Sequence, residues 1–146
     1  MATVRAATVE DVPAVVELWN RAAGPTRHAG QHVEAVRLIE RDRDALLVAV
    51  VDERIVGTLI VGWDGWRCHL YRMAVDPDFR RSGIGRLLVD RAREQAVARG
   101  AVRLDAMVND DNDAARTFWS GAGFEVDTED RRWSALLPAP EQIGCS

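Results

Sequence analysis

The sequence predicts one α/β domain, with a mixed, mostly antiparallel sheet, a central βαβ unit and flanking helices. Three β-rich runs, Leu46–Val51, Ile55–Trp63 and Arg67–Val75, are joined by short connections, which predicts an antiparallel meander. A long helical pattern and another β-rich run follow, and a single helical crossover makes the two strands that it joins parallel. With 146 residues and 47% apolar composition, the chain is long enough for one hydrophobic core.

The N-terminal part predicts one strand and two helices. Thr3–Ala7 alternates loosely, as a short first strand does. Thr8 is a typical helix N-cap with an acid three residues later, and an apolar stripe continues to about Ala23. Gly24–Gly30 interrupts the helical pattern, and a weaker helix is expected over Gln31–Arg41.

Glycines mark the ends of the central elements. Asp64-Gly65, between the second and third β-rich runs, is a strong hairpin signal and typical of a type I′ turn. The helix after the meander is expected over Gly83–Arg99, with Gly100 as the glycine that ends it.

The C-terminal part predicts three further strands and a short helix. In chain order the expected elements are a strand over Val102–Val108, a helix over Asp113–Gly121, and strands near Phe124–Asp127 and Arg132–Leu137. No linker divides the chain, so we expect a domain at residues 1–137 and a short polar tail at residues 138–146.

Composition and charge exclude several classes of function. The 19 basic residues are all arginine, which indicates a GC-rich bacterial genome and excludes any lysine chemistry. The net charge of −4 gives no sign of a nucleic-acid partner. The apolar runs are too short to cross a membrane. No signal peptide is visible and Cys68 and Cys145 lie far apart, so we expect free thiols and a cytoplasmic location.

The stretch DPDFRRSGIG, Asp76–Gly85, lies between a strand and a helix and has the chemistry of an anion site. The unpaired N–H groups of a helix N-terminus bind phosphate oxygens, and two glycines leave room for them. Nearby charge comes from Arg80, Arg81 and Arg86. The chain lacks the lysine of a P-loop, and Leu88 stands where a dinucleotide fingerprint has its third glycine. The pattern predicts a pyrophosphate site; a turn that only packs the helix on the sheet is the structural alternative.

Two motifs carry a resemblance to a known family. Arg80–Gly85, RRSGIG, resembles the pyrophosphate turn of the GNAT superfamily of acyl-CoA-dependent N-acetyltransferases. Asn112–Phe124, NDAARTFWSGAGF, is similar to the later segment of that family, NxxAxx(F/Y)(Y/F)xxxGF. The motifs occur in the family's order, and the first strand and helix also fit, so the resemblance extends over most of the chain. It implies a GNAT-like fold and N-acetyl transfer.

The resemblance implies acetyl-CoA as cosubstrate. In the family the donor enters between the strand that carries the turn and the next strand. Backbone groups of Met73–Val75 are then expected to pair with the pantetheine arm, and the amides of Arg81–Arg86 to bind the pyrophosphate. Asn112 and Trp119 are expected beside the thiol end. The expected cofactor-binding residues are Met73, Ala74, Val75, Arg80, Arg81, Ser82, Gly83, Ile84, Gly85, Arg86, Asn112 and Trp119.

The reaction implied by the resemblance is direct attack of an amine on the thioester in a ternary complex. The family's usual acid is a tyrosine of the later motif, but Trp119 occupies that position and has no proton to give at neutral pH. His69 and Tyr71 are the candidate catalytic residues, and we expect both to project to one sheet face together with Met73 and Val75. His69 is either a base or a surface residue without a role. Tyr71 is either an acid or a wall of the substrate site, and solvent is a third proton source.

We expect the acceptor to be a primary amine of a small polar molecule. The candidates for a flat apolar wall are Trp63, Trp66 and Trp133, and those for attracting a cation are Asp64, Asp110 and Asp111. Sheet packing and turn formation are the alternative roles of these residues. His28 and His32 lack a third ligand, which predicts no metal site, and Cys68 lacks a histidine partner for nucleophilic chemistry.

Two other functions remain open at this point. A catalytically weak domain that binds acyl-CoA as a sensor or scaffold is favoured by Trp119 in place of the usual tyrosine. A nucleotide-binding module using the same turn is the other, and competition by ATP or NAD would reveal it. A homodimer is compatible with each of these functions, because the edges of an open sheet can pair.

Overall fold

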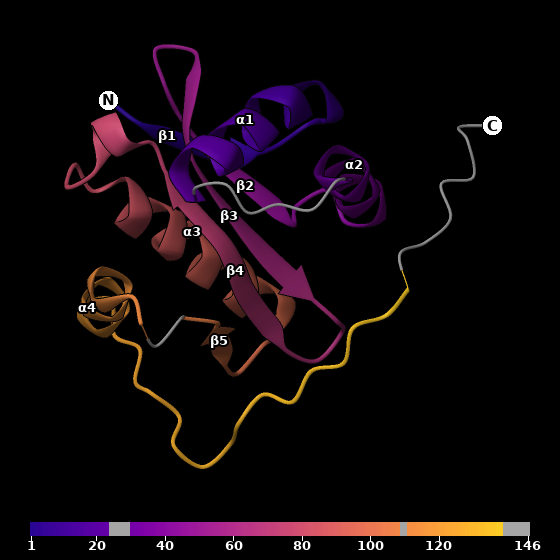
Figure 1. Ribbon diagram of the computed structural model, residues 1–146, viewed down its shortest axis with the longest axis vertical. Coiled ribbons are helices and arrows are strands. Elements are labelled where there is room, and N and C mark those ends of the chain that lie inside the picture. The colour runs from indigo at the N-terminus through magenta and orange to yellow at the C-terminus, as the bar shows by residue number, and fades with distance from the viewer. Residues whose placement is uncertain (24–29, 109–110, 139–146) are drawn as a thin grey trace.

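A computed structural model of the chain describes residues 1–23, 30–108 and 111–138. In these residues one sheet lies between two helical layers, and the strands lie side by side in chain order (Figure 1). The strands are β1 (Thr3–Ala6), β2 (Leu46–Val51), β3 (Arg54–Trp63), β4 (Cys68–Val75) and β5 (Leu104–Ala106). The helices are α1 (Val12–Ala23), α2 (Gln31–Arg41), α3 (Ile84–Arg99) and α4 (Asp113–Gly121), with short 3-10 turns η1 (Val9–Asp11) and η2 (Pro77–Phe79).

The predicted α/β class, the meander and the βαβ unit are confirmed. Strands β1 to β4 pair antiparallel, whereas β5 pairs parallel to β4 after the α3 crossover. Helices α1 and α2 cover one face of the sheet, and α3 and α4 cover the other. Both faces of the central strands are therefore buried, which explains why β2 reads LLVAVV without polar alternation. No helix of the described residues is long and apolar enough to span a bilayer.

The two hairpins have different turns, and only the second differs from its prediction. Asp52 and Glu53 form the two-residue connection between β2 and β3, with φ of 48° and 64°, as a type I′ turn requires. The hairpin at Asp64-Gly65 is confirmed, but its loop holds four residues, from Asp64 to Arg67. The Asp64 carboxylate accepts hydrogen bonds from the amides of Trp66 and Arg67 at 2.8 and 2.7 Å. This local capping replaces the shorter type I′ turn.

A β-bulge interrupts the pairing of β3 with β4. Thr58 lies opposite Ala74 and Ile60 lies opposite Tyr71, so β4 has one more residue than β3 between these pairs. Arg72 lies in the bulge with φ of 56°. The Thr58 hydroxyl donates to the Arg72 carbonyl at 3.2 Å, which supplies a partner for this irregular backbone.

The bulge corrects one prediction about the site. Because it adds one residue, the side chains beyond it change face. His69 and Tyr71 lie on the α1 side of the sheet, together with Ala74 of that core. Met73 and Val75 pack into the core on the α3 side. The expectation that all four side chains project to one face is therefore wrong.

The helix ends follow the sequence closely. Gly83 is the N-cap of α3 with φ of 83°, and Gly100 is its C-cap with φ of 89°. At the first helical turn, the Thr8 amide donates to the Asp11 carboxylate at 2.8 Å, as the predicted capping box requires.

The strands predicted after α4 are not formed within residues 122–138. Here the backbone follows an irregular path away from the sheet (Figure 1). Asp127 accepts hydrogen bonds from the amides of Glu129 and Asp130, and this local turn competes with strand pairing. Trp133 is 93% exposed. Strand β5 is also shorter than expected, and Val102 stands outside it, almost fully exposed.

Asp42 and Arg99 tie the end of α2 to the end of α3. The two terminal guanidinium nitrogens of Arg99 donate to the Asp42 carboxylate, at 2.8 and 2.9 Å. These hydrogen bonds hold the pKa of Asp42 below its usual value of 3.8. Asp42 is therefore expected to stabilise the fold at neutral pH.

Acidification is expected to remove this contribution. A carboxyl whose pKa is depressed by folding stabilises the protein above its unfolded pKa and loses that effect as the pH falls through its folded pKa. Asp42→Asn should lower the free energy of unfolding by about 1–2 kcal/mol near neutral pH. Below about pH 4 the difference from the wild type should shrink. Urea unfolding at a series of pH values measures this difference in the free energy of unfolding.

Asp90→Asn is the control for this series. Asp90 pairs with Arg86 at 3.5 Å, but both side chains are more than half exposed. Exposed pairs contribute little, so this variant should follow the wild type at every pH. A difference for Asp42→Asn that does not change with pH would contradict the assignment.

Candidate active site

Strands β4 and β5 pair only over a short stretch and then separate. The paired residues are Cys68 with Leu104, His69 with Asp105, and Leu70 with Ala106. One further hydrogen bond runs from the Met107 amide to the Leu70 carbonyl at 3.4 Å. Within the described residues, Tyr71–Val75 then has no strand on its β5 side. This edge offers backbone donors and acceptors to an extended ligand, and it includes the predicted Met73, Ala74 and Val75.

The end of β4 leads through a tight turn into α3. Arg81, with φ of 65°, and Gly83 adopt left-handed backbone conformations in this turn. The amide of Leu87 donates to the Gly83 carbonyl at 3.1 Å, so the amides of residues 84–86 precede the first helical hydrogen bond. A Cβ atom at Gly83 would meet no atom within 4 Å, so the space beside this helix cap is open. The geometry is that of an anion site.

Two glycines near this turn have packing roles: for Gly85 packing was the structural alternative to ligand binding, and Gly57 was not singled out from the sequence. A Cβ atom at Gly85 would lie 3.1 Å from the Phe118 ring of α4. A Cβ atom at Gly57 of β3 would lie 2.7 Å from the Ile84 side chain. The glycines thus bring α3 close to both β3 and α4, and a glycine inside a strand is the sequence signal that could have shown it.

The polar side chains of the turn divide into two groups. Arg80 and Arg81 are exposed, and neither makes an ion pair within the part of the chain that the structure describes. Arg86 instead donates to the Gly121 carbonyl of α4 at 3.3 Å. The Ser82 hydroxyl donates to the Phe79 carbonyl. Arg80 and Arg81 are therefore the side chains left to meet an anion.

His69 lies between two carboxylates. Its Nδ1 is 3.5 Å from Asp105 Oδ2 on β5, and its Nε2 is 3.8 Å from Asp64 Oδ2 in the hairpin. Backbone hydrogen bonds from Arg67 and Trp66 lower the pKa of Asp64, so this carboxyl stays charged. A carboxylate beside one ring nitrogen orients a histidine for proton transfer at the other. Sequence reasoning missed Asp105, because only the parallel register of β4 and β5 brings it to His69.

Tyr71 lies next to the opening, on the same sheet face as His69. It follows the last β4 residue paired with β5, and its side chain is 42% exposed. The neighbouring Arg72 places its guanidinium 4.8 Å from the centre of the Trp19 ring, toward α1. The structure thus brings His69 and Tyr71 together beside the place where β4 loses its partner strand.

The two predicted residues of the later motif have visible structural roles. Asn112 is the N-cap of α4, and its side chain accepts a hydrogen bond from the Ala115 amide at 3.0 Å. Trp119 is 7% exposed and packs edge-on against Phe118 and Phe124. Their place beside a cofactor stays a prediction. Phe118 and Gly121 of this motif contact the start of α3, at Gly85 and Arg86.

The acceptor candidates are not gathered into one wall. Trp63 packs into the core on the α3 side, on the sheet face opposite His69. Trp66 and Trp133 are exposed. Asp111 is exposed too, whereas Asp110 lies outside the described residues. Of the predicted acids, Asp64 lies beside a candidate catalytic group, His69.

The remaining candidates concern metal and thiol chemistry. His32 is exposed, and His28 lies outside the described residues. No three metal-ligating side chains gather among the described residues. Cys68 is fully buried, burial raises the pKa of its thiol, and it lies on the face opposite His69.

Comparisons with known proteins show the family of the chain and the fold that it shares. The profile of the acetyltransferase (GNAT) family matches residues 12–124. An acetyltransferase of Pectobacterium atrosepticum is 36% identical over 117 residues, which are 80% of this chain and 83% of that protein. The PaiA N-acetyltransferase of Thermoplasma acidophilum, solved with coenzyme A, aligns with a TM-score of 0.77 and 18% identity over 89% of this chain and 93% of its own. AAC(6′)-Iy, solved with the bisubstrate analogue CoA-S-monomethyl-acetylneamine, aligns with a TM-score of 0.75 and 17% identity over 94% and 99%. At these identities the two structures show the shared fold.

Proposed function

The chain belongs to the acetyltransferase (GNAT) family, and we propose that it transfers the acetyl group of acetyl-CoA to a primary amine of a small polar molecule. The reaction is direct attack within a ternary complex. One observation carries the donor assignment: the unpaired edge of Tyr71–Val75 leads straight to the open amides at the start of α3. A ligand with an extended, amide-containing arm that ends in a diphosphate fits this arrangement. The strand edge pairs with the arm, and the helix amides bind the diphosphate.

The diphosphate and the pantetheine arm of the donor then each have binding groups on the protein. The amides of residues 84–86 and the side chains of Arg80 and Arg81 bind the diphosphate. Backbone groups of Met73–Val75 bind the pantetheine arm. Coenzyme A bound to the PaiA N-acetyltransferase, which shares the fold, supports a donor of this kind. The buried residues on both sides of β4 keep the turn and the strand edge in fixed positions.

The reaction needs one proton removed from the amine and one proton delivered to the departing thiolate. The amine nitrogen forms a bond to the thioester carbonyl carbon, and the carbon–sulfur bond breaks. His69, oriented by Asp105, takes the proton that the amine loses. The departing thiolate takes its proton from Tyr71 or from solvent, and Tyr71→Phe separates these sources because it removes only the hydroxyl.

The acceptor class follows from charge beside His69. Asp64 and Asp105 lie on either side of the imidazole, and carboxylates there attract a protonated amine. The analogue bound to AAC(6′)-Iy supports a small amine, because it joins coenzyme A to an acetylneamine.

An acceptor panel tests this proposal. Amino sugars, polyamines and amino acids are compared with peptides that carry a free N-terminus, and thiol release from acetyl-CoA is followed. We expect at least one free amine to be acetylated, with the loss of one primary amine per thiol released. Acetylation of peptides alone would contradict the acceptor class. Binding of acetyl-CoA without thiol release from any acceptor would instead favour the sensor function suggested by Trp119.

A further inference from the structure

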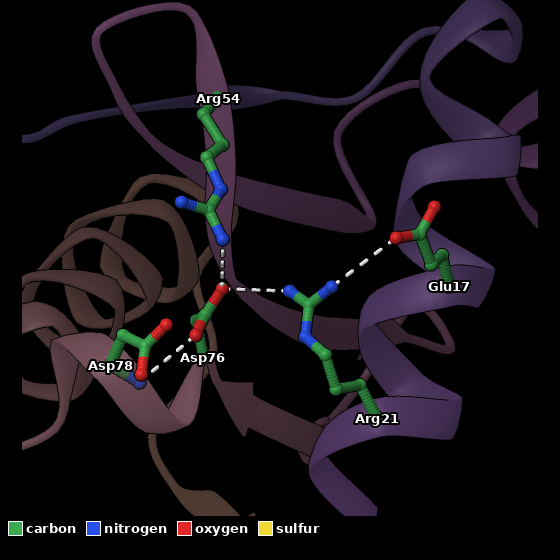
Figure 2. A network of polar contacts seen from close by, with 5 residues as sticks. All are labelled: Glu17, Arg21, Arg54, Asp76 and Asp78. Carbon is green, nitrogen blue, oxygen red and sulfur yellow. Dashed lines mark hydrogen bonds and ion pairs between the residues drawn. The ribbon is translucent and has the colours of Figure 1, made fainter.

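The carboxylate of Asp76 lies in a network at the base of the turn before α3. Asp76 is 1% exposed and directly follows β4. Figure 2 shows its Oδ2 between two arginines from distant segments, with Arg21 of α1 at 2.7 Å and Arg54 of β3 at 3.0 Å. Its Oδ1 accepts from the Asp78 amide at 2.9 Å. Arg21 also pairs with Glu17 at 3.3 Å, so the network extends along α1.

A series of contacts connects Asp76 with Ser82, the residue before the helix cap Gly83. The Phe79 amide donates to the Asp76 carbonyl at 2.8 Å. The Arg54 guanidinium lies 5.6 Å from the centre of the Phe79 ring, and the Phe79 carbonyl accepts from Ser82. Ser82 immediately precedes Gly83, the N-cap of α3. Asp76 thus accepts hydrogen bonds from η2 with both its carboxylate and its carbonyl. The last residue of η2, Phe79, in turn accepts a hydrogen bond from Ser82.

The turn requires such an anchor. Arg81 holds a left-handed conformation, which is unfavourable for a residue with a side chain and persists only where the surroundings fix it. Binding groups must also be held close to their productive geometry by neighbours that are themselves locked in place. The two arginines neutralise Asp76, so a carboxylate can stand behind a diphosphate site without repelling the ligand.

We propose that Asp76 is the positioning residue of the diphosphate turn. By binding Arg21, Arg54 and the Asp78 amide, it holds residues 77–83 in the conformation that presents the first α3 amides to the donor. The inference rests on the proposed function of this turn. Asp76 acts through the turn and not by contact with the ligand, because its carboxylate is buried and directed toward α1 and β3 (Figure 2).

Asp76→Asn and its matched control Asp42→Asn test the inference. Asparagine keeps the shape and can still accept from the Asp78 amide, but it loses the charge that binds both arginines. Asp42 also follows a regular element and binds an arginine, Arg99, but at the opposite end of α3. Titration with coenzyme A, steady-state kinetics and urea unfolding are measured for both variants and the wild type.

The expected result is a split between donor affinity and turnover. Asp76→Asn should raise the Kd of coenzyme A and the KM of acetyl-CoA about tenfold, with kcat changed less than about threefold. Asp42→Asn should keep Kd and KM within about twofold of the wild type while losing stability. Equal increases of Kd in both variants would mean a general loss of structure and would overturn the proposal.

Failure of the inference and failure of the proposed function give different results. If the wild type binds coenzyme A and Asp76→Asn binds it equally well, the positioning role is wrong and the function of the turn stands. If the wild type binds no coenzyme A, the proposed function is wrong and the inference falls with it. Arg54→Gln serves if Asp76→Asn does not fold, since the Arg54 side chain is 55% exposed. We expect it to raise Kd about threefold; an unchanged Kd would overturn the proposal.

Discussion

Replacing Gly83 by valine is expected to raise the Kd of acetyl-CoA at least about a hundredfold. At φ of 83° a β-branched residue is strained, so the turn has to change its backbone conformation. The valine side chain also fills the open space beside the helix cap, next to the amides of residues 84–86 that are proposed to bind the diphosphate. Both effects act on the ligand site itself. Calorimetric titration with acetyl-CoA measures the change.

Gly100→Val provides a matched control at the other end of the same helix. Gly100 has φ of 89°, and a Cβ atom there also meets no atom within 4 Å. The two variants should therefore lose similar stability, about 1–2 kcal/mol each in thermal or urea unfolding. Only Gly83→Val should lose affinity. Wild-type affinity in Gly83→Val, or equal losses in both variants, would contradict a diphosphate site at the start of α3.

Replacing His69 by glutamine is expected to lower kcat about a hundredfold and to remove the acidic limb of the pH–rate profile. Glutamine keeps a polar side chain but cannot accept the proton of the amine. The Asp105→Asn variant should lose less of its kcat, because Asp105 orients the imidazole without taking the proton itself. The KM of acetyl-CoA should stay close to the wild-type value in both variants, since neither side chain lies at the turn.

His32→Gln is the control for this prediction. His32 is an exposed histidine at the start of α2, and the variant should keep the wild-type rate at every pH. An acidic limb that persists unchanged in His69→Gln would remove His69 from the mechanism. Proton transfer to solvent would then be the remaining route for the amine.

Local signals in the sequence predicted much of the fold correctly. The start and end of α3 were found because Gly83 and Gly100 are its two caps, and caps are encoded by the residues that form them. The capping pair Thr8 and Asp11 marked the first helical turn in the same way. The meander of β2 to β4 followed from the short connections, and the parallel pairing of β5 with β4 followed from the single crossover.

The sheet face of each site residue could not be read from alternation alone. A period of two assigns His69, Tyr71, Met73 and Val75 to one face, but the bulge at Arg72 divides them. No residue type at this position signals the bulge, because arginine is not a residue that favours positive φ. For the proposed function the division separates the tasks: His69 and Tyr71 face the α1 side, while Met73 and Val75 anchor the strand edge in the α3 core.

The remaining differences come from contacts between distant segments. Asp105 meets His69 only through the parallel register of β5 with β4. Asp76 gains its arginines from α1 and β3, which are far from it in sequence. The strands expected after α4 show the opposite case: apolar residues such as Trp133 favour a strand locally but find no partner in the described structure.

Donor binding by this protein is tested by titrating the wild type with acetyl-CoA, with coenzyme A and ATP as comparison ligands. We expect binding of acetyl-CoA and coenzyme A with a Kd of about micromolar and no binding of ATP. ATP shares the phosphates and the adenine but lacks the pantetheine arm, so this result would show that the site takes an acyl-CoA donor and not any nucleotide. Absence of binding by both acetyl-CoA and coenzyme A would contradict it, and Gly83 and Gly85 would then serve only to turn the chain and pack α3.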